Sequence, residues 1–116
     1  MNWILVFIGG GLGSIVRYGF SIFLQRFLIQ FPIATLFSNI LACVILIILS
    51  GFLNKKSDLH FIQPLFIIGF CGGFSTFSTF SMETIQLFQN GQIYMALINI
   101  LVSIFSCLGI IYILSR

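Results

Sequence analysis

The residues best suited to chemistry form one stretch, "GFCGGFSTFSTFSMET", from Gly69 to Thr84. Its last residue but one is a carboxylate, Glu83, and every residue from Ser75 to Ser81 carries a hydroxyl or is a phenylalanine. Polar and ionisable groups inside an apolar segment are expensive and typical of ion or substrate pathways. Glycine, serine and threonine also weaken a helix, so we predict a helix interrupted near Gly72 to Ser78.

An interrupted membrane helix has a defined chemistry. Its freed backbone carbonyls can bind a cation. The N-terminus of the following half-helix, together with nearby hydroxyls, can donate to an anion. The alternative is that Gly69, Gly72 and Gly73 only allow neighbouring helices to approach closely. The residues of this stretch leave both interpretations open.

The phenylalanines favour an anion. Phe74, Phe77 and Phe80 are three residues apart, so on a continuous helix they share one face, and Glu83 follows one step further along. A phenyl ring has a positive edge, so rings turned edge-on to a pore would let a small anion pass without trapping it. The alternative is a stripe of aromatic residues that faces lipid or the protein core.

The elements that must position these groups are predicted from composition. The 116 residues are 59% hydrophobic and 6% charged, whereas soluble domains carry about 25% charged residues. Each crossing of a bilayer needs about 20 apolar residues. We therefore predict an all-α integral membrane protein, one domain over residues 1–116, with four transmembrane helices. These spans are Trp3 to Leu24, Ile33 to Leu53, Phe61 to Phe88 and Ile93 to Leu114, and the breaker pair Asn90-Gly91 lies between the last two.

The first apolar stretch is predicted to be a retained span. Only "MN" precedes it, with no Lys or Arg, and the stretch is longer than the apolar core of a signal peptide.

Positive charges are nearly balanced between the two sides of such a bundle. Lys55, Lys56 and Arg116 fall on the side of the termini, and Arg26 and Arg17 belong to the other side. Positive residues in short loops normally fix orientation, so this chain is predicted to be weakly oriented, which is compatible with insertion both ways up. Its net charge of +3 is too small and scattered to indicate a nucleic-acid partner.

The three cysteines, Cys43, Cys71 and Cys107, all lie inside predicted spans. Because their number is odd and no His or Cys stands at metal-ligand spacing, we predict small buried hydrophobic residues rather than disulfides or a metal site. His60 lies beside Asp58 in a predicted loop and is assigned a solvated surface role. Without a nucleophile–base pair or metal cluster, we do not expect an enzyme.

Three segments together resemble a known family. "GGGLGSIVRYGF" (Gly9 to Phe20), "PIATLFSNILA" (Pro32 to Ala42) and the Gly69 to Thr84 stretch are similar, in order and spacing, to the three motif blocks of the Fluc family of fluoride channels. The resemblance covers essentially the whole chain. It departs at Ser14, Ala34 and Ala42, which exchange one small residue for another, and at Ser75, which keeps a hydroxyl.

The resemblance implies an antiparallel, dual-topology homodimer in the cell membrane, the inner membrane in a bacterium. It implies passive fluoride export through two pores along the subunit interface, with a structural sodium ion at the dimer centre. The roles that it implies are pore-lining rings for Phe77 and Phe80, a fluoride-binding amide for Asn39, sodium ligation by the carbonyls of Gly72 and Ser75, an ion path for Thr79, Ser81, Glu83 and Ser103, and an electropositive vestibule for Arg17.

Two other functions remain in view. A small dual-topology, proton-coupled multidrug exporter would have a similar length, but it needs a carboxylate deep in the first span, and none is present there. A helper subunit of a larger membrane complex would use the polar string only to hold helices together. How Phe77 and Phe80 are shared between two pores, and whether Asn99 belongs to the path, stay open at this point.

Overall fold

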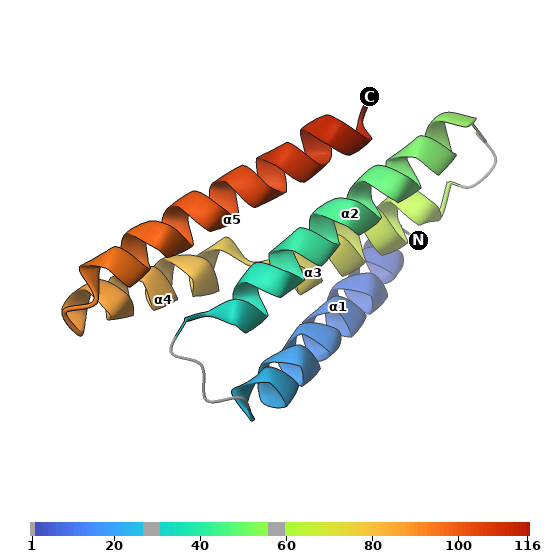
Figure 1. Ribbon diagram of the computed structural model, residues 1–116. Helices are drawn as coiled ribbons and strands as arrows, with labels where there is room; N and C mark the ends of the chain where they lie inside the picture. Colours follow the sequence, from blue (N-terminus) through green and yellow to red (C-terminus); the bar gives the residue numbers. More distant parts are fainter. Residues whose placement is uncertain (1, 27–30, 56–59) are drawn as a thin grey trace.

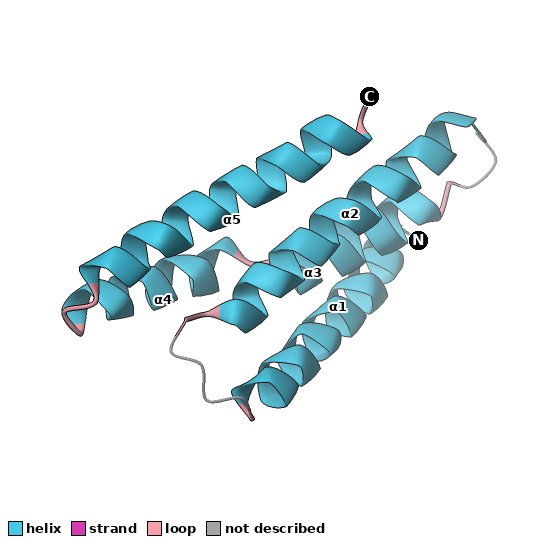
Figure 2. Ribbon diagram, viewed as in Figure 1, coloured by secondary structure: helices cyan, strands magenta, loops and turns pink. Residues whose placement is uncertain are grey.

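The computed structural model describes residues 2–26, 31–55 and 60–116, so Lys56 of the charge argument and Asp58, the neighbour of His60, lie outside the described residues. Within these ranges every regular element is helical (Figure 2). Four segments are long and apolar enough to cross a membrane. They are α1 (Asn2–Gln25), α2 (Ile33–Lys55), the interrupted span Gln63–Gln89, and α5 (Ile93–Leu114). The predicted all-α fold with four spans is confirmed.

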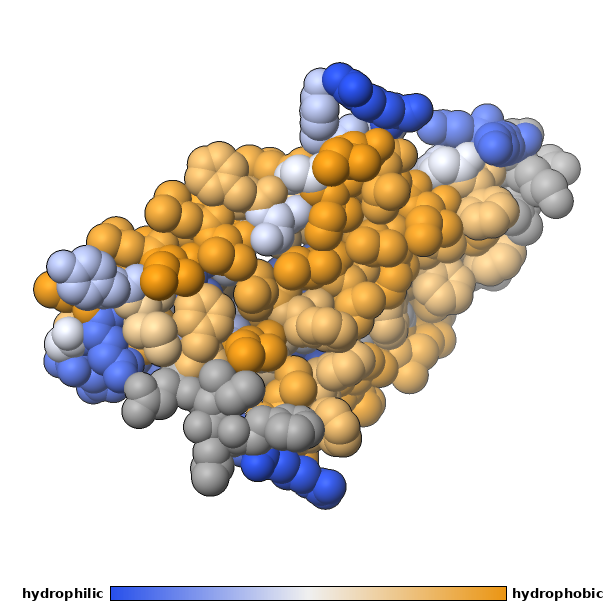
Figure 3. Space-filling view, in the orientation of Figure 1, coloured by the Kyte–Doolittle hydropathy of each residue, from blue (hydrophilic) through white to orange (hydrophobic). Residues whose placement is uncertain are grey.

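The helices run up and down in one bundle. Both termini lie at the end of the molecule where α2 finishes, and the turn between the third span and α5 lies at the other end (Figure 1). A broad hydrophobic band covers the middle of the visible face, with hydrophilic residues at its ends (Figure 3). This distribution is the one that a bilayer requires of a bundle that crosses it.

The third span is divided into two helical parts. A π-helix, η1 (Gln63–Cys71), continues into the short α3 (Gly72–Phe74), and α4 (Phe77–Gln89) begins after two residues. Ser75 and Thr76 between them have extended backbones, with φ/ψ of −86°/152° and −153°/123°. The interruption therefore lies inside the predicted segment and is made by two hydroxyl residues.

The glycines before the break serve helix packing. A Cβ on Gly9 of α1 would overlap the Leu65 carbonyl oxygen, and one on Gly73 would overlap the Gly10 carbonyl oxygen. The backbones of α1 and the first half of the third span thus touch directly, as small residues permit in membrane helices. Close packing and an interrupted helix, which the sequence left as alternatives, both occur, and Gly73 is still helical.

The two halves of the third span pack on different partners. η1 and α3 pack mainly on α1 and α2, whereas α4 packs mainly on α5 and touches α2 only lightly. Phe74 is 1% exposed and packs against Phe20, with ring centroids 5.8 Å apart. Phe77 is 78% exposed. The prediction that Phe74 and Phe77 share one face is therefore wrong, because the extended residues between them reset the helical phase.

A tight turn sets α5 antiparallel to α4. The Asn90 N–H donates to the Gln86 carbonyl, and Gly91 has φ of +79°, a conformation that glycine adopts without a steric penalty. The predicted Asn90-Gly91 breaker is thus a real turn. It brings α4 alongside α5, where the Asn99 side chain donates to Thr84.

Candidate ion pathway at the helix break

At the break, two backbone N–H groups donate to side chains instead of to backbone carbonyls. In a continuous helix the Thr76 N–H would donate to the Gly72 carbonyl, but here it donates to Oδ1 of Asn39, 3.0 Å away. The Thr79 N–H would likewise reach the Ser75 carbonyl, but it donates to Oγ1 of Thr76, the N-cap of α4, at 3.3 Å. The carbonyls of Gly72 and Ser75 therefore lose their usual helical donors.

The other carbonyls near the break have donors from side chains. Ser75 Oγ donates to the Cys71 carbonyl at 2.7 Å. Arg17 Nε, from α1, donates to the Gly73 carbonyl at 3.2 Å. The half-buried Arg17 thus lies against the break itself and brings a positive charge to within hydrogen-bonding distance of it.

The Asn39 amide has a fixed orientation. A backbone N–H can only donate, so the amide atom that meets Thr76 must be the oxygen. The amide NH₂ group therefore points away from the break backbone and remains a donor. Asn39 is the residue through which α2 holds the interrupted helix open.

A groove runs beside the break between α2, η1, α4 and α5, and we call it the break groove. Its volume is about 490 Å³. It is lined by Asn39, Ala42, Cys43, Leu46, Ile67, Cys71, Gly72, Ser75, Thr76, Phe77, Phe80, Ser103, Ile104, Cys107 and Leu108.

Both predicted pore rings line the break groove. The centroids of Phe77 and Phe80 are 5.7 Å apart, with their planes tilted by 38°. Phe80 is 9% exposed, whereas Phe77 lies almost entirely on the surface of the single chain. Within one chain the two rings therefore belong to the same groove, one at its wall and one at its open side.

A chain of hydrogen bonds ties α4 to α5 behind Phe80. Ser103 Oγ donates to Asn99 Oδ1 at 3.3 Å, and Asn99 Nδ2 donates to Thr84 Oγ1 at 2.9 Å. Thr84 in turn donates to the Phe80 carbonyl at 2.7 Å. Asn99 is fully buried in this chain and does not line the groove, whereas Ser103 does. Thr84, which closes the motif string, was not predicted as a site residue.

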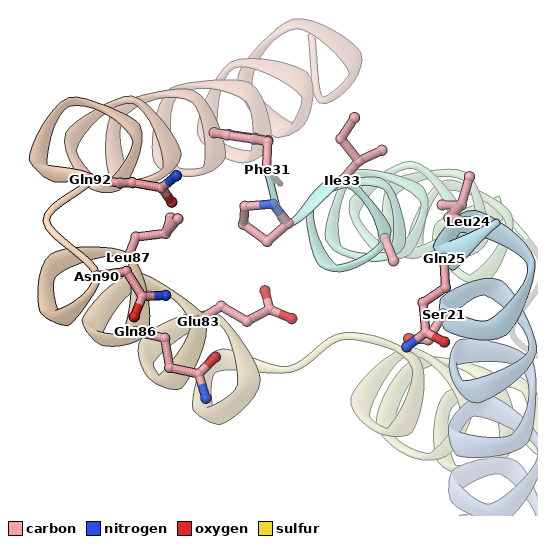
Figure 4. A pocket seen from close by; sticks show the side chains of 12 residues that line it. Ser21, Leu24, Gln25, Phe31, Ile33, Glu83, Gln86, Leu87, Asn90 and Gln92 are labelled. Carbon is pink, nitrogen blue, oxygen red and sulfur yellow. The ribbon is translucent and has the colours of Figure 1, made fainter. Parts of the chain in front are cut away.

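Glu83 lies in a different hollow, which we call the Glu83 pocket. Its volume is about 430 Å³, and its lining residues come from α1, α2, the residues before α2, α4 and the turn after α4. Figure 4 shows the Glu83 carboxylate pointing from α4 into this space. Oε1 accepts from Thr35 Oγ1 at 2.8 Å, and Oε2 is buried without a hydrogen-bond partner among the described residues.

The separation of Glu83 from the rings follows from helix geometry. At 3.6 residues per turn, each step of three residues falls short of a full turn by about 60°. Two steps from Phe77 to Glu83 therefore rotate the side chain by about 120°. The rings face the break groove, and the carboxylate faces α2.

The remaining hydroxyls of the string bond locally. Thr79 Oγ1 accepts from Thr76 Oγ1 at 3.3 Å, and Ser81 Oγ donates to the Phe77 carbonyl at 2.9 Å. Neither residue lines the break groove or the Glu83 pocket. The structure thus gathers Asn39, Gly72, Ser75, Phe77, Phe80 and Ser103 around one groove, and it leaves Glu83, Thr79 and Ser81 outside it.

These features define a class of protein. The chain is a multi-pass membrane protein whose third span is broken, and at the break two backbone carbonyls lose their helical donors while the Asn39 amide is held in one orientation. Such arrangements are typical of ion-binding sites in channels and transporters.

Comparison with known proteins identifies the family. The chain matches the family model of CrcB-like protein, Camphor Resistance (CrcB), over residues 4–114, and it belongs to this family. It is 38% identical over 112 residues to a fluoride-specific ion channel FluC of Coxiella burnetii (strain CbuK_Q154), covering 94% of this chain and 90% of the relative.

Two further relatives are also named fluoride-specific ion channels. A fluoride-specific ion channel FluC 2 of Bacillus subtilis (strain 168) is 42% identical over 107 residues, 92% of this chain and 78% of the relative. A fluoride-specific ion channel FluC of Pyrococcus horikoshii is 41% identical over 109 residues, 93% of this chain and 88% of the relative. The relatives are named as ion channels, so the expectation that this chain is not an enzyme is confirmed.

Proposed function

We propose that this chain is a passive fluoride channel of the cell membrane. The observation that carries the proposal is the hydrogen bond from the Thr76 N–H to Asn39 Oδ1, because it opens the third helix and turns the amide NH₂ toward the groove in one step. The names of the relatives supply the ion.

The break groove suits a small, strongly hydrated anion. Such an ion must exchange lost water for hydrogen-bond donors, yet bind weakly enough to leave. The Asn39 amide offers a donor, and Phe77 and Phe80 offer ring edges of weakly positive potential. Arg17, next to the break, adds a charge that draws anions inward.

Export needs no energy source beyond the membrane potential. A potential negative inside is worth about 2.3 kcal/mol per charge per 100 mV, and it drives an anion out of the cell. We assign Glu83, Thr79 and Ser81 to the wider ion path as hydrogen-bonding groups near the groove rather than in it.

We further propose that two copies assemble in antiparallel orientation, with two pores along their interface. Lys55 and Arg116 lie at one end of the helix bundle, and Arg26 lies at the other end. The positive charges of the described residues therefore favour one orientation in the membrane only slightly. The highly exposed Phe77 beside the break gives a second copy an aromatic surface to cover.

A structural sodium ion fits the break. The carbonyls of Gly72 and Ser75 have lost their helical donors, and hard cations prefer several oxygen ligands. Two carbonyls from one chain are too few, so a second copy at the dimer centre would have to supply a matching pair. In this role the ion would neutralise carbonyl dipoles that face one another across the interface.

The deciding experiment is efflux of fluoride from liposomes that contain the purified protein, followed with a fluoride electrode. Fast, uncoupled efflux with little chloride efflux is expected. A correctly assembled protein that passes no fluoride would overturn the proposal. The multidrug-exporter alternative predicts proton-driven transport, but α1 holds no carboxylate for it.

A further inference from the structure

Cys43 and Cys107 line the break groove from two different helices. Cys43 comes from α2 and Cys107 from α5, and both are half-buried. Their side chains lie close enough for an electrostatic interaction. The two residues are 64 positions apart and belong to different spans, so no local pattern connects them. The prediction of small buried hydrophobic residues does not include two thiols on one open groove.

We propose that Cys43 and Cys107 form a two-coordinate site for a soft, thiophilic dication of the mercuric type, and that a cation bound there closes the break groove. Thiolate sulfur prefers such soft metals over Mg²⁺ or Ca²⁺. Among the described residues, no three His, Cys, Asp or Glu side chains come close enough to hold a metal ion together. Two ligands therefore suit metals that accept linear coordination by two sulfurs.

The balance of charge favours this site in an apolar groove. When Hg²⁺ binds, each thiol loses one proton and each sulfur forms one bond to the metal, so the dication is exchanged for two protons released to water. The resulting bis-thiolate is neutral, and a neutral complex avoids the cost of burying a charge among apolar side chains. No oxidant or reductant takes part.

The position of the pair explains the closure. Cys43 lies one helical turn beyond Asn39 on α2, and Cys107 lies one turn beyond Ser103 on α5, so each cysteine is next to a polar residue of the groove. A metal held between them bridges α2 and α5 across the groove at the level of these polar residues. This consequence for ion flux rests on the proposed function, but the binding site itself does not.

Cys71 provides a matched control. It lines the same groove and lies close enough to Cys43 for an electrostatic interaction, but it is 3% exposed. Substitution by alanine at all three positions changes volume equally. Only Cys43→Ala and Cys107→Ala remove a ligand of the proposed pair.

The binding test uses the purified full-length protein in detergent, with mercuric chloride as the probe and intact-mass and ultraviolet absorption measurements as readouts. One Hg²⁺ per chain is expected. Cys43→Ala and Cys107→Ala should each weaken binding by about 100-fold, because the second sulfur no longer acts intramolecularly, whereas Cys71→Ala should bind as the parent does. Size-exclusion profiles confirm that the variants are assembled.

Three results would overturn the site: unchanged binding by Cys43→Ala or Cys107→Ala, loss of tight binding by Cys71→Ala, or a purified chain whose mass shows Cys43 and Cys107 already joined in a disulfide. A second readout is fluoride efflux, which Hg²⁺ should stop in the parent and in Cys71→Ala, with recovery after dithiothreitol. Tight binding with unaltered efflux would refute closure alone. If untreated protein passes no fluoride, the proposed function is refuted, but the mass measurement still tests whether Cys43 and Cys107 bind Hg²⁺.

Discussion

Asn39→Ala should damage both the fold and the flux, because Asn39 supplies an acceptor to the break and a donor to the groove. Loss of Oδ1 leaves the Thr76 N–H without its 3.0 Å partner. An unpaired buried donor costs about 1–3 kcal/mol. Thr76 is half-buried, so we expect the lower part of this range, about 1–2 kcal/mol of stability.

Asn39→Asp separates the two roles. A carboxylate oxygen still accepts from the Thr76 N–H, and a negative charge at the N-terminus of α4 is electrostatically favourable. The variant should therefore be more stable than Asn39→Ala. Its donor to the anion is gone, however. Hydrogen bonds to charged groups are worth about 1.5–3 kcal/mol, so fluoride flux should fall by roughly 10- to 150-fold in both variants.

The assays are fluoride efflux from liposomes and thermal melting of the detergent-solubilised protein. Ser106→Ala is the control, because Ser106 lines neither the break groove nor the Glu83 pocket. If Asn39→Asp conducts fluoride at the parental rate, Asn39 does not serve the ion. If Asn39→Ala melts at the parental temperature, the amide does not hold the break.

Other substitutions test the break, the packing and the rings. Phe80→Ile and Phe77→Ile should each cut fluoride efflux severely while the protein stays assembled, and normal efflux in both would remove the role given to ring edges. Gly13→Ala should prevent normal assembly because its Cβ would overlap the Phe70 carbonyl, whereas Gly11→Ala, with open space around it, should behave as the parent on size-exclusion chromatography. Thr76→Val removes the N-cap of α4 and should cost about 0.5–2 kcal/mol, with Thr76→Ser close to parental in thermal melting. Tags on the C-terminus should report both sides of the membrane in similar amounts; a single orientation would refute the antiparallel dimer.

The sequence alone determined the parts of this protein that depend on local composition. Hydropathy predicted the four spans, because a bilayer selects for apolar length one helix at a time. Glycine and hydroxyl content predicted an interrupted third span, because helix propensity is a local property. Asn90 and Gly91 predicted the last turn for the same reason.

Only the tertiary structure decided which groups meet at the break. The Thr76 N–H leaves the helix because an acceptor 37 residues away, on α2, takes its hydrogen bond. Gly69 and Gly73 pack on α1 because α1 also carries glycines, Gly9 and Gly10, at the facing positions. Neither effect is visible in the stretch from Gly69 to Thr84 taken by itself.

The same reason explains the misplaced and missed residues. Two extended residues, Ser75 and Thr76, place Phe74 and Phe77 on different faces. Glu83 points toward α2 because a spacing of three residues is less than one full helical turn. The sequence predicts small buried hydrophobic residues at Cys43 and Cys107, whereas the packing of α2 on α5 places both on one groove. The sequence determined what each span is made of, and the packing between spans determined which of its groups face a common groove.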